Sequence, residues 1–339
     1  MDIALALASI IGGLVLLVKG SDFFIDGAAE IAKRLGVSEI IIGLTLVAFG
    51  TSLPEWIASI ISTLRNPSDV ACIANSTCHI TDLALGNVVG SNITNIGFVI
   101  GLVGLLSPHG LRIAPIFLNR DMPLLVIISV MAMYMGLNDN SVSQPEGILL
   151  IGVFLATLYR MLTQNNVSTD QEEEPNDTEE ESEDDAGSDL ETSSIFKLYA
   201  LTIGGLVALL VGSNFLVEGA SSLALLMGIT EKVIGVTLVA FGTSVPELAT
   251  SIAAGKKGKH GMLLGGVIGS NTANLAIILG SVATLVPVSM SLEYIRFEMG
   301  IMMANVLLLW VCMLQGKIER WQALVLLLGY FVFTITLFV

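Results

Sequence analysis

One polar stretch interrupts the apolar sequence, and the chain contains it twice. Residues 43–55 end in Gly-Thr-Ser-Leu-Pro-Glu, and residues 235–247 end in Gly-Thr-Ser-Val-Pro-Glu. At a fixed offset of 192 positions, 26 of the 45 residues in 11–55 are identical to those in 203–247. Unrelated apolar helices would share leucine and valine, whereas here threonine, serine, proline and glutamate match in register. We therefore interpret the two stretches as products of an internal duplication.

A second duplicated block follows each copy. Gly-Asn-Val-Val-Gly-Ser-Asn-Ile-Thr-Asn begins at residue 86, and Gly-Gly-Val-Ile-Gly-Ser-Asn-Thr-Ala-Asn begins at residue 265. The two blocks divide the chain into a predicted first repeat, a linker and a predicted second repeat. Their ranges are 1–163 (motifs 43–55 and 86–101), 164–193, and 194–339 (motifs 235–247 and 265–280).

The composition is that of a polytopic membrane protein. Hydrophobic residues make up 53% of the chain and charged residues only 13%, and the mean hydropathy is +0.81. Apolar stretches of about 20 residues, long enough to span a bilayer, recur throughout. We predict an all-α fold of ten transmembrane helices, five in each repeat. The predicted helices cover 3–34, 38–63, 83–106, 121–137, 146–163, 194–226, 232–254, 261–287, 296–315 and 320–338.

The net charge of -15 comes mainly from one segment. Thirteen acidic residues lie between Asp170 and Glu191 with no basic residue among them. Such a segment is typical of a disordered, solvated linker, and loose binding of divalent cations by its carboxylates is the alternative. Outside this segment the net charge is small, so we expect no nucleic-acid partner. We expect the helices to lie in a lipid bilayer and to need no obligate protein partner.

The basic residues predict how the chain crosses the membrane. Eleven lysines and arginines in loops fall on one side of the predicted helices and three on the other, and the richer side is usually cytoplasmic. Both termini are then outside a cell membrane, and the acidic linker is cytoplasmic. Because five is an odd number, the second repeat enters from the opposite side to the first. The repeats are therefore predicted to be inverted, a layout of many secondary transporters.

The three cysteines are too few for a disulfide scaffold. Cys72 and Cys78 lie in a loop predicted to face outside, where either a small disulfide or a zinc site with His79 is conceivable. Cys312 lies in an apolar segment and is predicted to be a core residue.

The repeated signature gathers oxygen atoms on one helix face. Thr51 and Ser52 lie four and three residues before Glu55 and so share its face. Pro54 cannot donate to the carbonyl of Gly50, so the helix is expected to bend and free backbone oxygens. A carboxylate in a membrane span costs several kcal/mol, about 2.5 or more, which makes it a functional-site hypothesis by default.

The second copy repeats these features with Thr243, Ser244, Pro246 and Glu247. In each copy of the Gly-Ser-Asn block, a serine and an asparagine lie four residues apart. The pairs are Ser91 with Asn95 and Ser270 with Asn274.

Together these side chains predict a cation site. An all-oxygen set without histidine or cysteine suits hard cations such as Ca²⁺ or Na⁺. Two buried carboxylates need one divalent cation, two monovalent cations or two protons, and competition among these is the outline of antiport. The alternative is that the serines, threonines and asparagines only hydrogen-bond neighbouring helices.

The paired motifs resemble the α-repeats of the cation/calcium exchanger superfamily, and most closely the prokaryotic type of the sodium/calcium exchanger family. The resemblance implies ten helices, exchange of Na⁺ for Ca²⁺, and sliding of the first and sixth helices. It places the ion ligands at positions that match the family's motifs. These are Glu55, Glu247, Thr51, Ser52, Thr243, Ser244, Ser91, Asn95, Ser270 and the carbonyls of Ala48 and Ala240.

One position departs from that pattern. Many sodium/calcium and potassium-dependent exchangers carry aspartate where this chain has Asn274. The charge of the site falls by one, which bears on the number of Na⁺ ions and on the choice of Na⁺ or H⁺ as counter-ion. Proton exchangers of the superfamily usually show Gly-Asn-Ala-x-Glu in this block, so the resemblance implies that the Gly-Ser-Asn form found here favours Na⁺.

The sequence therefore predicts a Na⁺/Ca²⁺ antiporter that works by alternating access at a midplane site. It is not expected to be an enzyme or to need a cofactor, because Na⁺ and Ca²⁺ are the transported ions. An H⁺/Ca²⁺ antiporter is the alternative, since burial favours the protonated form of a glutamate. A cation channel is the candidate from another class.

Overall fold

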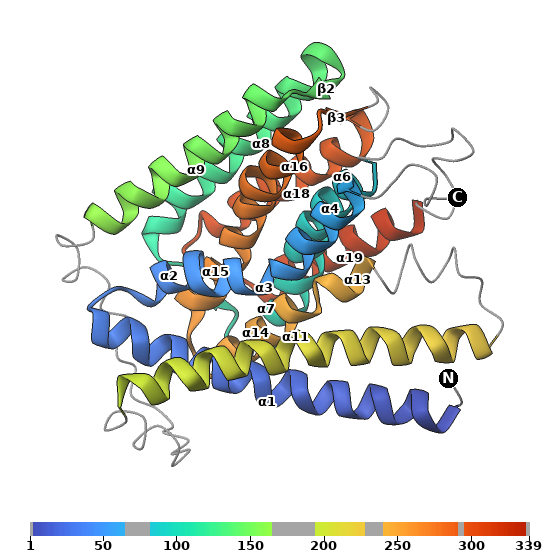
Figure 1. Ribbon diagram of the computed structural model, residues 1–339. Helices are drawn as coiled ribbons and strands as arrows, with labels where there is room; N and C mark the ends of the chain where they lie inside the picture. Colours follow the sequence, from blue (N-terminus) through green and yellow to red (C-terminus); the bar gives the residue numbers. More distant parts are fainter. Residues whose placement is uncertain (1–2, 65–81, 165–193, 228–239, 291–294, 337–339) are drawn as a thin grey trace. The chain divides into compact units, whose positions relative to one another are not determined.

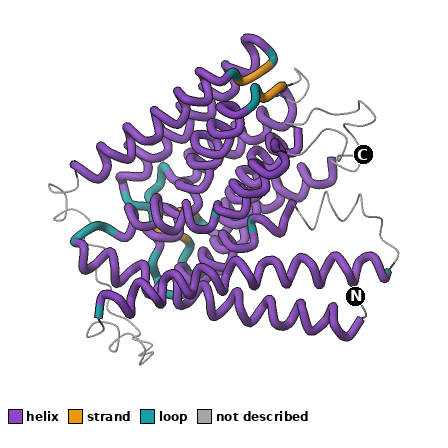
Figure 2. The backbone as a smooth tube through the Cα atoms, in the orientation of Figure 1, coloured by secondary structure: helices purple, strands orange, loops and turns teal. Residues whose placement is uncertain are grey.

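The computed structural model describes residues 3–64, 82–164, 194–227, 240–290 and 295–336. These residues are almost entirely helical, apart from two short pairs of strands (Figures 1 and 2). Cys72, Cys78, His79, the acidic run and residues 235–239 of the second signature lie outside the described residues. The chain forms two compact units, one of residues 1–50 and 158–266 and the other of residues 51–157 and 267–339.

The first unit is built mainly from two long helices and the region of the second signature. Its elements are α1 (Ile3–Leu35), α2 (Glu39–Ile42), the π-helical turn η1 (Gly43–Val47), α3 (Ala48–Thr51) up to Gly50, the end of α9 (Gln144–Gln164) from residue 158, α11 (Ile195–Leu226), α13 (Ala240–Thr243), α14 (Val245–Lys256) and the start of α15 (His260–Ala273).

The second unit contains the remaining elements. They are α4 (Leu53–Leu64), α6 (Asp82–Ile93), η3 (Thr94–Ile100), α7 (Gly101–Leu106), β1 (Leu111–Arg112), η4 (Phe117–Asp121), α8 (Met122–Asp139), β2 (Ser141–Val142), α9 (Gln144–Gln164) up to Thr157, the end of α15, η7 (Asn274–Ile278), α16 (Leu279–Leu285), β3 (Val288–Ser289), η8 (Ile295–Met299), α18 (Gly300–Met313), β4 (Lys317–Ile318) and α19 (Arg320–Thr336).

Membrane spans are found at most of the predicted places. Within the described residues, seven continuous helical stretches are long and apolar enough to cross a bilayer, and the bent pair 39–64 makes an eighth. The prediction of ten spans is therefore confirmed only in part. The predicted span 320–338 is the shorter helix α19, and the predicted span 232–254 is only partly described. Cys312 is buried in α18, as predicted.

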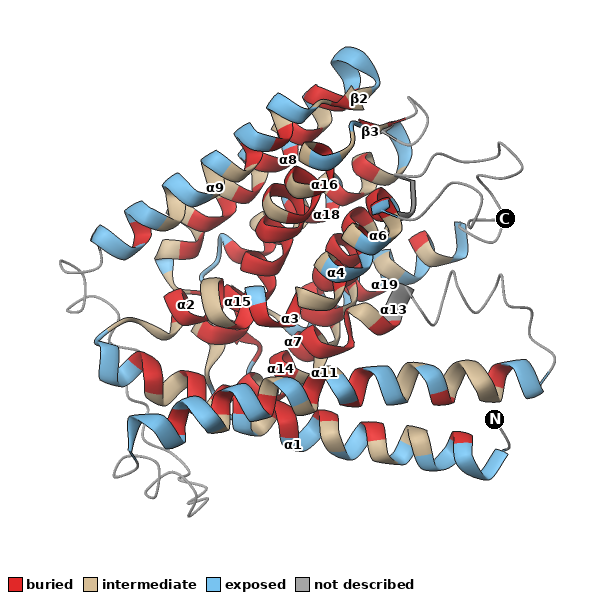
Figure 3. Ribbon diagram, in the orientation of Figure 1, coloured by how far each residue is buried: buried red, intermediate tan, exposed pale blue. Residues whose placement is uncertain are grey.

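The surface of the spans suits a lipid environment. The stretch from α15 to α16 is mostly buried, whereas α9 exposes side chains along most of its length (Figure 3). The exposed side chains of α9 include large apolar ones such as Ile148, Leu149 and Leu155. In water such a face would be costly, but lipid tails are as apolar as these side chains.

A seam of glycines joins α1 to α11, which lie side by side in Figure 1. The glycines recur every seven residues on both helices, at 13, 20 and 27 and at 205, 212 and 219. A Cβ atom on Gly13 would lie 2.7 Å from the carbonyl oxygen of Gly212, and one on Gly20 would lie 2.9 Å from that of Gly205. The backbones are therefore in direct contact, as in other tightly packed membrane helices.

The seam also shows which of the duplicated glycines matter for packing. Gly12 and Gly204 are duplicated as well, but a Cβ atom on either would meet nothing within 4 Å. Of the two Gly-Gly pairs, only Gly13 and Gly205 therefore take part in the close packing of the helices.

Both strand pairs join the two predicted repeats. Strand β1 pairs with β4, with Leu111 opposite Ile318, and β2 pairs with β3, with Ser141 opposite Ser289. Strands β1 and β2 come from the predicted first repeat, and β3 and β4 come from the second. These antiparallel pairs satisfy backbone groups where helices end, and each does so with a partner from the other repeat.

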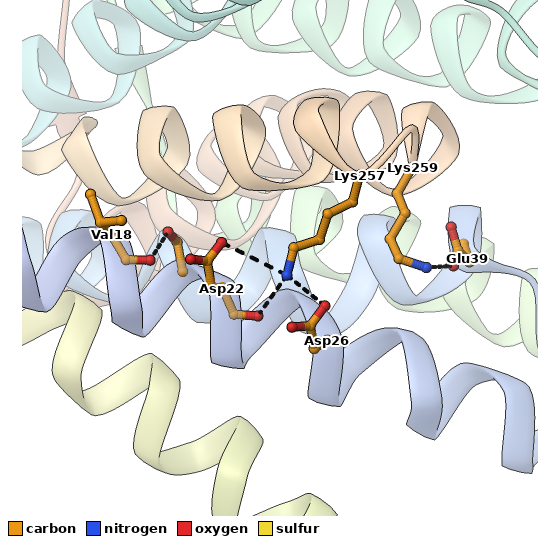
Figure 4. A network of polar contacts seen from close by, with 7 residues as sticks. Val18, Asp22, Asp26, Glu39, Lys257 and Lys259 are labelled. Atoms are coloured by element: carbon orange, nitrogen blue, oxygen red, sulfur yellow. Dashed lines mark hydrogen bonds and ion pairs between the residues drawn. The ribbon is translucent and has the colours of Figure 1, made fainter. Parts of the chain in front are cut away.

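Ion pairs fix the end of α14 that lies away from Glu247. Lys257, which follows α14, has its Nζ 2.6 Å from Oδ1 of Asp26 and 3.7 Å from Oδ1 of Asp22, both on α1 (Figure 4). Lys259 pairs with Glu39 of α2. All of these side chains are partly exposed, so each pair contributes little, roughly 0–1 kcal/mol. They link the segment that follows α14 to α1 and α2.

The glycine seam leads to a first prediction. Replacing Gly13 with alanine forces two backbones apart, and overpacking of this kind costs about 1–3 kcal/mol. Gly12→Ala is the matched control, because alanine is favoured over glycine in a helix by about 1 kcal/mol and the new methyl meets nothing. We expect thermal unfolding in detergent to show a lower midpoint for Gly13→Ala and an unchanged or higher one for Gly12→Ala. Equal midpoints would show that the helices do not pack through this seam.

The ion pairs lead to a second prediction. Lys257→Met should lower the free energy of unfolding by up to about 1 kcal/mol, and the loss should shrink at high ionic strength because solvent ions screen exposed charges. The exposed neighbour Lys256 supplies the control Lys256→Met. Thermal unfolding at low and high choline chloride measures both variants without adding Na⁺. If Asp26→Asn and Lys257→Met have additive effects, the two side chains are not coupled.

Candidate functional site

Both copies of the signature break a helix at the same residue. Helix α3 ends at Thr51 and α4 begins at Leu53, while α13 ends at Thr243 and α14 begins at Val245. A serine stands at each break, and Ser244 has dihedral angles of φ -89° and ψ 2°. The duplicated sequence thus gives a duplicated local structure.

The break precedes the proline, which corrects the predicted position of the bend. Pro54 and Pro246 each occupy the second residue of the new helix, in its first turn. A proline is readily accepted there because the first N–H groups of a helix have no partner within the helix. The helix therefore ends at the serine, and the proline helps to start the next one.

Each break places a glutamate in the first turn of the new helix. The glutamates are Glu55 in α4 and Glu247 in α14, and only 0% and 2% of their respective surfaces are exposed. The first turn carries the positive end of the helix dipole, so a carboxylate is more favourable there than elsewhere along the helix. The local structure thus lowers the cost of burying each charge but does not remove it.

The backbone carbonyl freed in the second copy has a side-chain partner. Pro246 has no N–H to donate to the carbonyl of Gly242, and the hydroxyl of Ser213 on α11 donates to this carbonyl instead, at 2.8 Å. The predicted freeing of this carbonyl is confirmed. The matching serine of the first copy, Ser21, donates to Val18 of its own helix at 3.0 Å, so the two copies differ at this point.

The predicted ligands are divided between the two units. The second unit contains seven of them, and all seven are buried: Thr51, Ser52, Glu55, Ser91, Asn95, Ser270 and Asn274. The first unit contains the other five: Ala48, Ala240, Thr243, Ser244 and Glu247.

Within the second unit, contacts link the predicted ligands of the two repeats. The hydroxyl oxygens of Thr51 and Ser270 lie 3.5 Å apart, and Nδ2 of Asn274 donates to Oγ of Ser91 at 3.2 Å. The structure therefore gathers predicted ligands into one buried group. Thr51 comes from the first signature, Ser91 from the first copy of the second duplicated block, and Ser270 and Asn274 from the other copy of that block. The contacts between buried polar side chains of both repeats mark this group as the candidate site.

Three asparagines at the site are absent from the predicted ligands. Asn87 donates from Nδ2 to the carbonyl of Glu55 at 3.1 Å and to Oγ of Ser59 at 3.0 Å, which ties α6 to α4. Asn92 and Asn271 are completely buried and bonded to the asparagines of the opposite copy. Asn92 and Asn271 match each other in the duplicated block at an offset of 179 residues, which was the sequence signal for them. The duplication did not show which side chains face the site.

The chemistry of the group is that of oxygen ligands for a hard cation. Among the described residues, no three of His, Cys, Asp and Glu lie close enough together to hold a metal. Ca²⁺ takes about six to eight oxygen ligands, so most ligands at a site with Glu55 or Glu247 would be hydroxyl, amide and carbonyl oxygens. Two such atoms, Oδ1 of Asn95 and of Asn274, are buried and accept no hydrogen bond from the described residues.

Comparison with known proteins gives consistent matches along the chain. The family described as sodium/calcium exchanger protein matches residues 5–163 and 197–339. The uncharacterised membrane protein MJ0091 of Methanocaldococcus jannaschii is 35% identical over 322 residues, with 94% of each chain covered. The sodium/calcium exchanger MaX1 of Methanosarcina acetivorans is 33% identical over 353 residues, with 96% of each covered.

The fold agrees with these relatives. A solved structure of the sodium-calcium exchanger NCX_Mj has a TM-score of 0.79 and 31% sequence identity, and the match covers 99% of this chain and 100% of that one. Relatives and structure match the chain on both sides of the acidic segment, over the helices that carry both copies of the signature. The chain is therefore a multi-pass membrane protein of the sodium/calcium exchanger family.

Proposed function

We propose that this protein exchanges Na⁺ for Ca²⁺ across the membrane by alternating access. The observation that carries the proposal is the pair of broken helices, each with a buried glutamate in its first turn. Two carboxylates balance either one Ca²⁺ or two Na⁺, so the two loads exclude each other electrostatically. Exchange follows if the protein changes conformation only when one of the two loads is bound.

The proposed ligands supply the oxygen atoms that such ions need. Glu55 and Glu247 supply the charge, and the neutral oxygens complete the coordination shell. The neutral ligands in this proposal are Thr51, Ser52, Thr243, Ser244, Ser91, Asn95, Ser270, Asn274 and the carbonyls of Ala48 and Ala240.

Reciprocal contacts support the proposal that the repeats are inverted. In α1 and α11, Gly13 contacts Gly212 while its counterpart Gly205 contacts Gly20. The strand pairs show the same reciprocity, with β1 on β4 and β3 on β2. Such exchange of partners is expected for two copies related by a twofold axis in the membrane plane, with the ion site at the midplane.

One contact supports the proposed orientation in the membrane. Arg112 and Lys317 both belong to the eleven basic residues on the side predicted to be cytoplasmic. They lie opposite each other in the strand pair β1–β4. In this orientation both termini are outside and the acidic linker is in the cytoplasm.

The contacts of Asn274 bear on the counter-ion. Its Nδ2 donates to Ser91 and to Asn92, at 3.2 and 3.0 Å, and an ionised aspartate could make neither bond. The charge of the proposed site is therefore that of the two glutamates alone. We keep Na⁺ as the counter-ion and H⁺ as the alternative that the experiment below separates.

Uptake of ⁴⁵Ca²⁺ into proteoliposomes tests the function. We expect uptake to require internal Na⁺, to saturate, and to fall at least about tenfold, or 1.4 kcal/mol, in both Glu55→Gln and Glu247→Gln. Glu319→Gln is the control, because Glu319 is a partly exposed glutamate that pairs with Lys317 and is not a proposed ligand. Uptake driven by a pH gradient without Na⁺ would identify a proton exchanger, and uptake that needs no counter-gradient would identify a channel.

Deleting residues 170–191 tests the role of the acidic segment. We expect Na⁺-driven uptake to stay within about threefold of the full chain, because a solvated linker carries no ligand of the proposed site. The measurement is the same uptake assay at several Ca²⁺ concentrations. Loss of uptake with normal insertion into liposomes would instead assign Ca²⁺ sensing to the acidic segment.

A further inference from the structure

Four asparagines form one completely buried hydrogen-bonded group in the second unit. Asn92 and Asn95 come from α6 and η3, and Asn271 and Asn274 come from α15 and η7. Asn95 and Asn274 are proposed ion ligands, whereas nothing so far assigns a role to Asn92 or Asn271. A buried amide that is not fully bonded costs about 1–3 kcal/mol, so the direction of each bond in this group matters.

Two of these bonds cross between the helices as a reciprocal pair. Nδ2 of Asn92 donates to the backbone carbonyl of Asn271 at 3.2 Å, and Nδ2 of Asn271 donates to the backbone carbonyl of Asn92 at 3.3 Å. A backbone carbonyl can only accept. Each of these two side chains must therefore direct its NH₂ group at the opposite backbone, and its oxygen Oδ1 is left to face elsewhere.

The orientation of the two ligands follows from this constraint. Oδ1 of Asn271 accepts from Nδ2 of Asn95 at 3.1 Å, and Oδ1 of Asn92 accepts from Nδ2 of Asn274 at 3.0 Å. Because the NH₂ groups of Asn95 and Asn274 are directed at these acceptors, their own Oδ1 atoms face away from them. Those two oxygens are buried and accept no hydrogen bond from the described residues.

Oxygen and NH₂ are opposite in their effect on a cation. A flipped amide would direct a donor, with its partial positive charge, at the ion and would remove a ligand. We propose that Asn92 and Asn271 are positioning residues that prevent this flip and so keep Oδ1 of Asn274 and of Asn95 available to the transported cation. The inference rests on the proposed function, since it concerns how the same cation is bound.

The proposal and a purely structural role predict different pairs of residues whose substitutions have non-additive effects. If Asn271 acts through Asn95, then removing Asn271 matters little once Asn95 has been replaced, and the same holds for Asn92 and Asn274. The crossed pairs, Asn92 with Asn95 and Asn271 with Asn274, share no side-chain hydrogen bond among those described. They are the matched controls and should be additive.

The experiment measures the Ca²⁺ concentration that half-maximally raises the thermal unfolding midpoint of the purified full chain, alongside Na⁺-driven uptake. Loss of an outer partner of a metal ligand typically weakens metal binding about 10–100-fold, and we expect a shift of this size for Asn271→Leu and for Asn92→Leu. In the Asn95→Leu background we expect Asn271→Leu to shift the concentration by less than about threefold. Additive effects in the pairs Asn271 with Asn95 and Asn92 with Asn274 would overturn the proposal.

A second variant separates orientation from packing. Asn271→Asp keeps an acceptor in front of Nδ2 of Asn95 but turns the donation to the Asn92 carbonyl into repulsion. We expect it to bind Ca²⁺ at least ten times more tightly than Asn271→Leu (about 1.4 kcal/mol), even if it unfolds at a lower temperature without Ca²⁺. Binding as weak as in Asn271→Leu would show that the group only holds the helices together. If the unaltered protein neither binds Ca²⁺ nor transports it, the proposed function fails instead.

Discussion

A break in a membrane helix is the constraint on which this structure depends. Lipid offers no hydrogen bonds, so every backbone group freed by the breaks at Ser52 and Ser244 needs a partner from the protein or a ligand. Ser213 supplies one partner by donating to the carbonyl of Gly242. The first turns of α4 and α14 supply a favourable place for a carboxylate. The feature that creates unsatisfied groups therefore also concentrates the oxygen atoms that a cation requires.

The pair of long helices in the first unit and the polar group in the second unit are held by different kinds of contact. The long helices α1 and α11 meet through glycines, so their backbones touch without directional bonds at Gly13 and Gly20. The polar group of the second unit is joined by hydrogen bonds with fixed donors and acceptors, as between Asn95 and Asn271. A smooth seam fixes the distance between helices more firmly than their relative register, while directional bonds fix both.

The sequence predicted which polar residues matter more reliably than it predicted their exact geometry. The duplicated signature correctly indicated a helix interruption, but a proline is equally compatible with a kink and with a first turn, so the break was placed at Pro54 instead of Ser52. Gly12 and Gly13 are duplicated alike, and only packing distinguishes them. Asn92 was matched to Asn271 by the duplication, yet its role depends on a hydrogen bond between residues 179 positions apart.

The hydrogen bonds of Asn274 explain why an amide is suited to this position. Its NH₂ group has two acceptors, Oγ of Ser91 and Oδ1 of Asn92, and Ser91 uses its own proton to donate to the carbonyl of Asn87 at 2.6 Å. An ionised carboxylate at this point would face two acceptors with no proton between them, and burial would make that arrangement costly. Asparagine avoids this cost at every pH. In the proposed site it also leaves the two glutamates to set the charge, which would balance one Ca²⁺ or two Na⁺.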